Sequence, residues 1–195
     1  MHPALLVVDV QGDFCPGGAL AVEHGDDIIP RLNKVVDTFE ELTLPLFFTR
    51  DWHPPDHISF RSRGGHWPPH CIRGSSGAEF HRELRVPRDA VIVSKGDNPS
   101  KEAYSGFQGT DLRARLGKLG VDEVIVGGLA TDYCVKETAL DALRAGFAVV
   151  VLVDCVRAVD VGQGDGDKAL AEMRKAGATL LTSVEAVEKL AGAQQ

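Results

Sequence analysis

Cys134 lies in a sequence context that favours chemical reactivity. A β-branched run, Glu123–Gly127, is followed by a second glycine, and a helical pattern begins near Tyr133. Thr131 or Asp132 is a natural N-cap for that helix, which places the cysteine in its first turn. There, unpaired backbone N–H groups and the positive end of the helix dipole favour a thiolate over a thiol. We therefore predict a nucleophile at Cys134, against the alternative that it is a small buried hydrophobic residue, as most free cysteines are.

Polar side chains follow three other apolar runs of the chain. Asp9 interrupts the first run, Asp51 and His53 follow the second, and Lys95 follows the third. Taken singly, an aspartate that caps a turn or a solvated loop lysine explains each of them. In parallel sheets, however, ligands bind where the carboxyl ends of the strands meet. Together with Cys134, these residues supply the nucleophile, base and cation that acyl transfer requires.

A second candidate group consists of one carboxylate and several histidines. Asp51 and His53 are two residues apart, so on an extended segment their side chains point to the same side. His57, His66 and His70 follow in a proline-rich stretch. Carboxylate oxygen and imidazole nitrogen suit Zn²⁺, Mn²⁺ or Fe²⁺, and three protein ligands leave coordination positions open for a substrate. The alternative is that these histidines are only surface residues of a loop.

The composition indicates an ordinary globular protein. A chain of 195 residues with 44% hydrophobic content suits a single domain, residues 1–195, with a substantial core. The net charge of −7 argues against nucleic acid or an anionic membrane as a partner. No apolar run reaches membrane-spanning length, and Ala4–Val10 lacks the basic leader of a signal peptide. Four scattered cysteines form no disulfide framework, so we expect a cytoplasmic protein with reduced thiols.

Apolar, β-branched runs alternate with helical patterns along the chain. The runs predict strands at Ala4–Val10, Pro45–Thr49, Ala90–Ser94, Glu123–Gly127, Ala148–Val153 and Thr179–Thr182. The segments between them predict helices near Asp27–Leu42, Asp111–Leu119, Tyr133–Ala145, Asp167–Ala176 and Val184–Leu190. This alternation predicts an α/β fold in three α/β/α layers around a six-stranded, mainly parallel, doubly wound sheet. The exception is an insert at about residues 50–87, which carries the metal-ligand candidates.

Two other features are interpreted as structural. Gly162, Gly164 and Gly166 echo a phosphate-binding loop, but they lie well beyond their strand and lack the full motif. They predict a flexible turn before the helix at Asp167. Cys155 directly follows a strand with no helix start close behind it, so we expect it to serve packing.

Several segments of the chain carry motifs of a known family. These segments are Asp9–Leu20, Asp51–His57, Trp67–Cys71, Lys95–Gly96, Gly128–Val135 and Ala176–Ser183. They resemble the motifs of nicotinamidases, within the isochorismatase-like superfamily of cysteine hydrolases. The resemblance runs from Ala4 to about Val187. The cysteine motif marks the superfamily alone, whereas the Asp-x-His and later His of the insert distinguish nicotinamidases.

The resemblance implies a role for each candidate residue. Cys134 would be the nucleophile, Asp9 the proton shuttle and Lys95 the third member of the catalytic triad. The implied metal ligands are Asp51, His53 and His70. Family members differ in whether a further histidine or waters complete the metal shell, so the role of His57 stays open. The resemblance also implies an isochorismatase-like, Rossmann-like sheet.

The surroundings of the reacting atoms are implied in the same way. Backbone N–H groups of Ala130 and Cys134 would form the oxyanion hole, and the Leu129–Ala130 peptide bond would be cis. The aromatic and pocket-wall positions of the family fall on Phe14, Trp67, Tyr104 and Tyr133. In relatives the metal contacts the pyridine nitrogen of nicotinamide.

The activity implied by the resemblance is metal-dependent hydrolysis of nicotinamide to nicotinate and ammonia through a cysteine thioester. This reaction belongs to NAD salvage, and pyrazinamide is expected to be a second substrate. The implied cofactor is one divalent metal ion, Zn before Mn or Fe. Relatives are often dimers or larger, which implies a homo-oligomer, although nothing in the sequence locates an interface.

Two alternatives remain open from the sequence. Another amidase of the superfamily, acting on an N-carbamoyl or ureido compound, would use the same triad but would not need Asp51, His53 and His70. From a different class, a non-catalytic metal-binding or interaction module could retain the fold, although a full triad argues against it.

Overall fold

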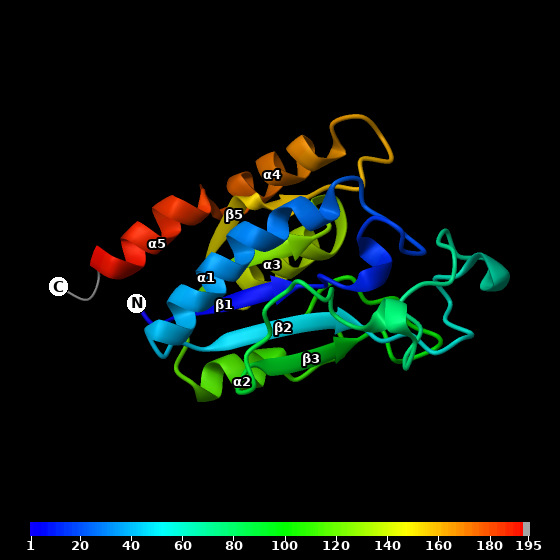
Figure 1. Cartoon of the computed structure of the whole chain (residues 1–195), viewed down its shortest axis with the longest axis horizontal. Helices are drawn as coiled ribbons and strands as arrows, with labels where there is room; N and C mark the ends of the chain where they lie inside the picture. The colour runs from blue at the N-terminus through cyan, green and yellow to red at the C-terminus, as the bar shows by residue number, and fades with distance from the viewer. Residues whose placement is uncertain (193–195) are drawn as a thin grey trace.

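The computed structural model describes residues 1–192, and its six strands form one parallel sheet (Figure 1). The strands are β1 (Pro3–Val8), β2 (Leu46–Asp51), β3 (Val91–Lys95), β4 (Glu123–Leu129), β5 (Ala148–Arg157) and β6 (Thr179–Leu181). Their order is β3-β2-β1-β4-β5-β6, and every neighbouring pair is parallel. The predicted α/β fold is confirmed, with a sheet that is wholly rather than mainly parallel.

The strand order reverses between β1 and β4. The chain first builds outward from β1 to β3, then returns to β4 on the other side of β1 and continues to β6. In open α/β sheets this reversal opens a crevice at the carboxyl ends of the strands, where ligands bind. The reversal therefore predicts a site beyond the ends of β1 and β4.

Helices cover both faces of the sheet. They are α1 (Ile29–Glu41), α2 (Leu112–Lys118), α3 (Lys136–Arg144), α4 (Asp165–Ala176) and α5 (Ser183–Gly192). Apolar residues of α1 and α5 pack with one face of the sheet, and those of α2, α3 and α4 pack with the other. Leu5 and Val7 of β1 join the first cluster, and Leu6 and Val8 join the second, because successive side chains of a strand point to opposite faces.

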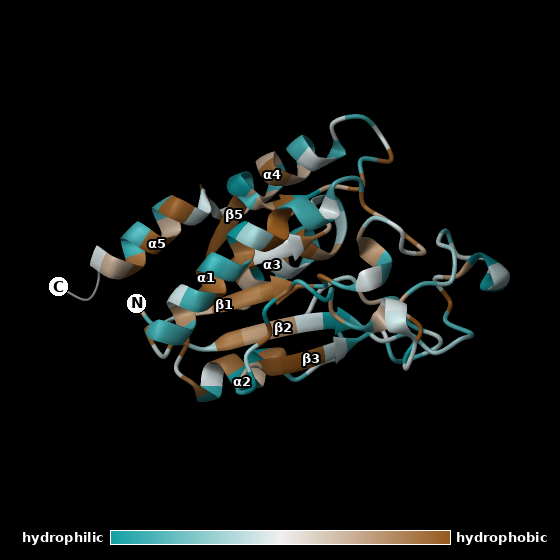
Figure 2. Cartoon of the chain, viewed as in Figure 1, coloured by the Kyte–Doolittle hydropathy of each residue, from teal (hydrophilic) through white to brown (hydrophobic). Residues whose placement is uncertain are grey.

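All six residues of β1 are buried, and this strand is apolar along its length, whereas β2 becomes hydrophilic at its carboxyl end (Figure 2). Gly128 of β4 is required where β4 passes β1. Its φ is +128°, and a Cβ there would lie 2.0 Å from the carbonyl oxygen of Val8. In the described part of the chain, no helix is long and apolar enough to cross a membrane; the longest, α1, has 13 residues.

Some predicted boundaries differ from the structure. Helix α3 begins at Lys136 rather than near Tyr133, and α4 begins at Asp165 rather than Asp167. Strand β5 continues to Arg157, past the predicted end at Val153, so Cys155 lies inside the strand. Cys155 is fully buried there, as expected for a packing residue.

The insert between β2 and β3 extends beyond the carboxyl ends of the strands (Figure 1). Its helical structure is limited to single turns at Arg61–Arg63 and Ser76–Ala78. Arg85 attaches the end of the insert to α1 through ion pairs with Asp37 and Glu40. The insert thus depends on contacts with the rest of the fold rather than on regular structure of its own.

Replacing Phe39 tests the packing of α1 on the sheet, because its side chain is fully buried in the apolar cluster on the α1 and α5 face. We expect Phe39→Ala to lower the free energy of unfolding by about 3–5 kcal/mol through the cavity that it creates. Urea denaturation monitored by circular dichroism measures the change. The control is Lys34→Ala on the exposed side of α1, which should stay within about 0.5 kcal/mol of the original. Equal losses in the two variants would contradict this packing.

Candidate active site

Asp9, Lys95 and Cys134 converge in one buried cluster. Asp9 directly follows β1, Lys95 is the last residue of β3, and Cys134 lies in the turn after β4. The Nζ atom of Lys95 is 2.8 Å from Oδ2 of Asp9 and 3.5 Å from Sγ of Cys134. The three residues are 0%, 1% and 6% exposed. The structure therefore brings together the acid, cation and thiol that the strand ends suggested.

The Asp9 carboxylate is held by a strained backbone and one hydroxyl group. Its φ is +49°, a left-handed conformation that non-glycine residues rarely adopt. Thr49 of β2 donates a hydrogen bond of 2.6 Å to Oδ1. Among the described residues, Oδ2 has the ion pair with Lys95 but no hydrogen bond of good geometry. A carboxylate oxygen of Asp9 lies within 4.8 Å of the Cys134 sulfur, so this carboxylate can accept the thiol proton.

Burial controls the protonation of the cluster. Burial raises the pKa of Asp9, and the Lys95 ammonium offsets this effect only in part. Burial lowers the pKa of Lys95, but the carboxylates of Asp51 and Asp9 outweigh it and hold that pKa well above its usual range. The pKa of the Cys134 thiol is raised well above its usual value by burial, despite the nearby Lys95 ammonium.

The prediction of a resting thiolate stabilised by a helix N-terminus is therefore wrong. Cys134 lies in one wide turn, Thr131–Val135, in which the N–H of Val135 donates to the carbonyl of Ala130 five residues earlier. Neither Thr131 nor Asp132 caps the helix. Because the thiol is buried beside carboxylates, burial rather than the helix dipole sets its protonation.

The carboxylate of Asp51 and the imidazoles of His53 and His70 form the second cluster. Donor atoms of the three side chains lie within 4.8 Å of one another, and all three are buried. Nδ1 of His53 bonds the carbonyl of Gly96 at 2.8 Å, and Nδ1 of His70 bonds that of Pro68 at 2.8 Å. Each backbone bond leaves Nε2 for a ligand, the usual arrangement of metal-binding histidines. This oxygen and nitrogen donor set fits a divalent ion.

His57 and His66 take no part in this cluster. Both ring nitrogens of His57 already have partners, the hydroxyl of Ser59 at 2.7 Å and the carbonyl of Lys101 at 2.9 Å. The His57 ring stacks on the His53 ring with centroids 4.1 Å apart, so it supports that ring from behind. His66 is exposed in the insert. Within residues 1–192, the donor set thus consists of Asp51, His53 and His70.

Gly96 and Gln11 hold the second cluster in place. Gly96 has a φ of +67°, and a Cβ there would lie 2.4 Å from the His53 ring, so only glycine leaves room for that ring. Gln11 is fully buried, accepts from the N–H of Asp51 and donates to the carbonyls of Asp51 and Ala78. These bonds fix the end of β2 against the insert.

Lys95 joins the two clusters. Its Nζ atom also donates a hydrogen bond of 2.5 Å to Oδ1 of Asp51, while Oδ2 of Asp51 is 3.5 Å from Nε2 of His53. Burial would raise the pKa of Asp51, but Lys95 and His53 outweigh burial and lower it. Asp51 therefore remains a carboxylate, as a metal ligand must.

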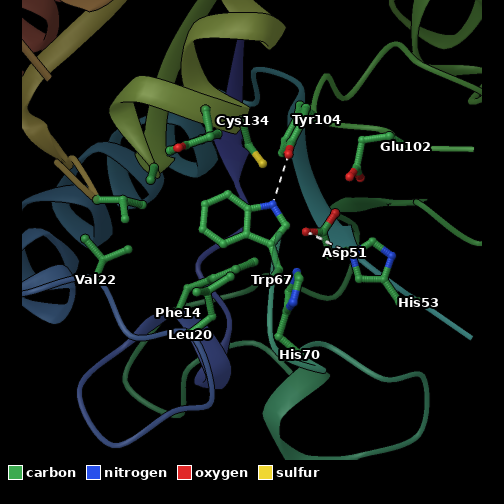
Figure 3. A pocket seen from close by; sticks show the side chains of 13 residues that line it. Phe14, Leu20, Val22, Asp51, His53, Trp67, His70, Glu102, Tyr104 and Cys134 are labelled. Carbon is green, nitrogen blue, oxygen red and sulfur yellow. Dashed lines mark hydrogen bonds and ion pairs between the residues drawn. The ribbon is translucent and has the colours of Figure 1, made fainter. Parts of the chain in front are cut away.

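A pocket opens onto both clusters (Figure 3). Its lining includes Cys134, Asp51, His53 and His70 together with the predicted wall residues Phe14, Trp67, Tyr104 and Tyr133. The indole of Trp67 packs edge-on against Tyr133 at 5.1 Å and donates a hydrogen bond of 3.0 Å to the hydroxyl of Tyr104. Burial raises the pKa of Tyr104 to about 12. These rings form a largely apolar slot for a small aromatic molecule.

Sequence reasoning missed several residues of the site. The further lining residues are Leu20, Val22, Glu102, Ala130 as a wall residue, and Val159. Leu20 and Val22 share one loop and the others come from three further segments, and no local pattern distinguishes them. Gln11 and Thr49 were detectable in principle, because a polar residue next to or inside an apolar strand needs a buried partner. The Leu129–Ala130 peptide bond is cis, as the family resemblance implied.

Comparison with known proteins places the chain in a family. The profile of the isochorismatase domain matches residues 3–185. The chain belongs to the isochorismatase family. Within this family it is similar to a nicotinamidase of Escherichia coli (strain K12), with 42% identity over 200 residues that cover 92% of this chain and 94% of the relative. The resemblance found in the sequence is confirmed.

Solved structures of the isochorismatase fold agree with this assignment. A pyrazinamidase of Pyrococcus horikoshii in complex with zinc superimposes with a TM-score of 0.90 at 50% identity, covering 93% of this chain and 99% of that one. A protein of L. infantum in complex with nicotinate gives a TM-score of 0.84 at 36% identity, covering 93% of each chain.

The donor set can be tested by metal binding. We expect His70→Ala to weaken the affinity for Zn²⁺ by at least about 100-fold, since even loss of an outer partner costs roughly 10–100-fold. Titration of the metal-free protein against a competing chromophoric chelator measures this affinity. The matched control is His66→Ala, which removes an exposed histidine of the same insert and should bind as the original does. Unaltered binding by His70→Ala would contradict the donor set.

Proposed function

We propose that the protein hydrolyses nicotinamide to nicotinate and ammonia through a thioester on Cys134. The observation that carries the proposal is that one buried lysine joins a thiol–carboxylate pair to a metal-type donor set in a single aromatic pocket. Hydrolysis of an amide requires the nucleophile and base of the thiol–carboxylate pair. A metal ion at the donor set would bind a pyridine nitrogen. The similarity to nicotinamidases and to a structure with bound nicotinate supports this substrate.

Substrate binding uses the aromatic slot. Trp67, Tyr133 and Phe14 contact the faces and edge of a planar ring, which limits its orientation. A divalent ion held by Asp51, His53 and His70, which we propose to be zinc, would act as a Lewis acid toward the pyridine nitrogen. With the ring nitrogen held beside these three residues, the carboxamide carbon would point toward Cys134, which lines the same pocket. Pyrazinamide keeps a ring nitrogen in the same relation to its carboxamide and is therefore a second substrate.

Acyl transfer begins with proton transfer from Cys134 to Asp9. Burial raises the pKa of the Cys134 thiol, so the sulfur keeps its proton at rest, and Lys95 would stabilise the thiolate as it forms. The sulfur then attacks the amide carbon, and the carbonyl becomes an oxyanion. Backbone N–H groups of Ala130 and Cys134 would bind this oxyanion, a contribution of about 3 kcal/mol per donor in other hydrolases.

Collapse of the oxyanion breaks the carbon–nitrogen bond. Asp9 returns its proton to the departing nitrogen, so ammonia leaves and a nicotinoyl thioester remains on Cys134. Asp9, again a carboxylate, accepts a proton from an incoming water as its oxygen attacks the thioester. The thioester bond breaks, nicotinate is released, and the proton returns to the sulfur.

We also propose that the enzyme acts in NAD salvage, lies in the cytoplasm and assembles as a homo-oligomer. The first rests on the product nicotinate, the second on the free cysteines, all four of which are buried, and the third on the family resemblance. Light scattering coupled to gel filtration tests the third.

Cys134→Ala tests the covalent route. Without the nucleophile, ammonia release from nicotinamide should fall on the order of a million-fold, as in other hydrolases that lose their nucleophile. A coupled ammonia assay measures the rate, and metal content confirms that the site is otherwise intact. Cys155→Ala is the matched control, because that buried thiol lies in β5 outside the pocket. Full activity of Cys134→Ala would exclude a thioester on this residue.

Metal removal separates the proposal from its nearest rival. An amidase acting on an N-carbamoyl compound would use the same triad without the metal donor set. We expect a chelator to abolish ammonia release from nicotinamide and stoichiometric Zn²⁺ to restore it. Release that persists after complete metal removal, or release only from an N-carbamoyl amino acid, would favour the rival.

A further inference from the structure

Asp132 is a motif residue that the mechanism leaves without a role. It lies in the turn that carries Cys134, yet it does not cap the helix that follows. Its Oδ1 atom accepts the N–H of Val159 at 2.9 Å, and its Oδ2 atom accepts the N–H of Asp160, also at 2.9 Å. Both oxygens of one carboxylate thus bind consecutive backbone groups of a segment that follows β5. Charged acceptors make these bonds stronger than neutral ones.

The segment held by Asp132 forms part of the substrate pocket. Val159 lines the pocket together with Cys134, and it packs against the apolar cluster that contains Phe14 and Val22. Figure 3 shows Val22 on the side of the pocket away from Asp51 and His53. Val159 follows β5, which lies on the other side of β1 and β4 from β2, the strand that ends at Asp51. Val159 therefore belongs to the apolar lining on the side of the pocket away from Asp51.

The segment is fixed at its far side as well. Asp160 has a φ of +52°, and its Oδ1 atom accepts the N–H of Gly166 in the first turn of α4 at 2.7 Å. A Cβ at Gly166 would lie 2.6 Å from the Cβ of Ala158, so α4 can approach the segment this closely only with glycine there. Val159 thus lies between the hydrogen bonds to Asp132 and the hydrogen bond from Gly166 to Asp160. The position of its side chain depends on the carboxylate of Asp132.

We propose that Asp132 is a positioning residue that holds Val159 against the pocket, and that Val159 thereby limits the size of the aromatic amide that the enzyme accepts. The inference rests on the proposed function, which places the ring nitrogen at the donor set and the carboxamide at Cys134. Carbon 5 lies on the ring edge opposite the ring nitrogen and the carboxamide. This edge then faces the wall that includes Val159. A methyl group at that carbon would compete with the valine for space.

The test compares nicotinamide with 5-methylnicotinamide as substrates of the metal-loaded enzyme. Val159→Ala should raise the ratio of kcat/KM for the methylated amide over nicotinamide by about tenfold or more, the usual effect of one carbon atom in an apolar pocket. Asp132→Asn turns one acceptor into a donor that faces a backbone N–H. It should shift the ratio in the same direction, with the change carried by KM.

The double variant tests whether Asp132 affects the substrate preference through Val159 or independently of it. If Asp132 acts through Val159, adding Asp132→Asn to Val159→Ala should leave the ratio of the single Val159→Ala variant unchanged. The matched control is Asp154→Asn, because Asp154 also accepts two hydrogen bonds, from the N–H and hydroxyl of Ser183, but lies outside the pocket. Its ratio should equal that of the original enzyme.

Each outcome decides the inference. An unchanged ratio in Val159→Ala, a further shift in the double variant, or a loss of kcat alone in Asp132→Asn would overturn it. If Asp132→Asn does not fold, Asp132→Glu carries the same test, because it keeps both oxygens but lengthens the connection to the segment. An original enzyme inactive on both amides would instead overturn the proposed function, and the inference with it.

Discussion

The ammonium of Lys95 lies between two buried carboxylates, Asp9 at 2.8 Å and Asp51 at 2.5 Å. A buried charge without a partner is strongly destabilising, so removing this cation would leave two carboxylates facing each other in a medium of low polarity. The same cation contacts the sulfur of Cys134. Proton transfer at the thiol and ligand binding at the donor set therefore share one charge, and neither group can be arranged independently of the other.

Strand register produces this arrangement. Asp51 of β2 pairs with Lys95 of β3, and Thr49, which binds the Asp9 carboxylate, pairs with Val8 of β1. The Asp51–Lys95 ion pair thus forms between neighbouring strands, and Lys95 also reaches Asp9 at the end of the next strand, β1. Cys134 arrives from the other half of the sheet, because the strand order reverses between β1 and β4. The insert supplies His53, His70 and the wall residue Trp67, and contacts with the rest of the fold hold it in place although it lacks regular structure.

The sequence predicted the parts of the site that depend on strand ends. Asp9, Lys95 and Cys134 could be brought together because parallel strands end at a common edge, while the aromatic wall residues came only from family resemblance. The protonation of Cys134 was beyond reach, because it depends on burial by distant segments. For the same reason no local pattern indicated Val159, whose place in the pocket is set by Asp132 across 27 residues of chain.

The central claim is that the donor set and the thiol act on the same bound molecule. Benzamide has the carboxamide of nicotinamide but no ring nitrogen, so comparing kcat/KM for the two amides in the original enzyme and in His70→Ala measures the coupling directly. The predicted result is a preference for nicotinamide of at least about a hundredfold, which falls toward unity in the variant. A preference that is equally large in both proteins would contradict the claim, because ring recognition would then not depend on the donor set.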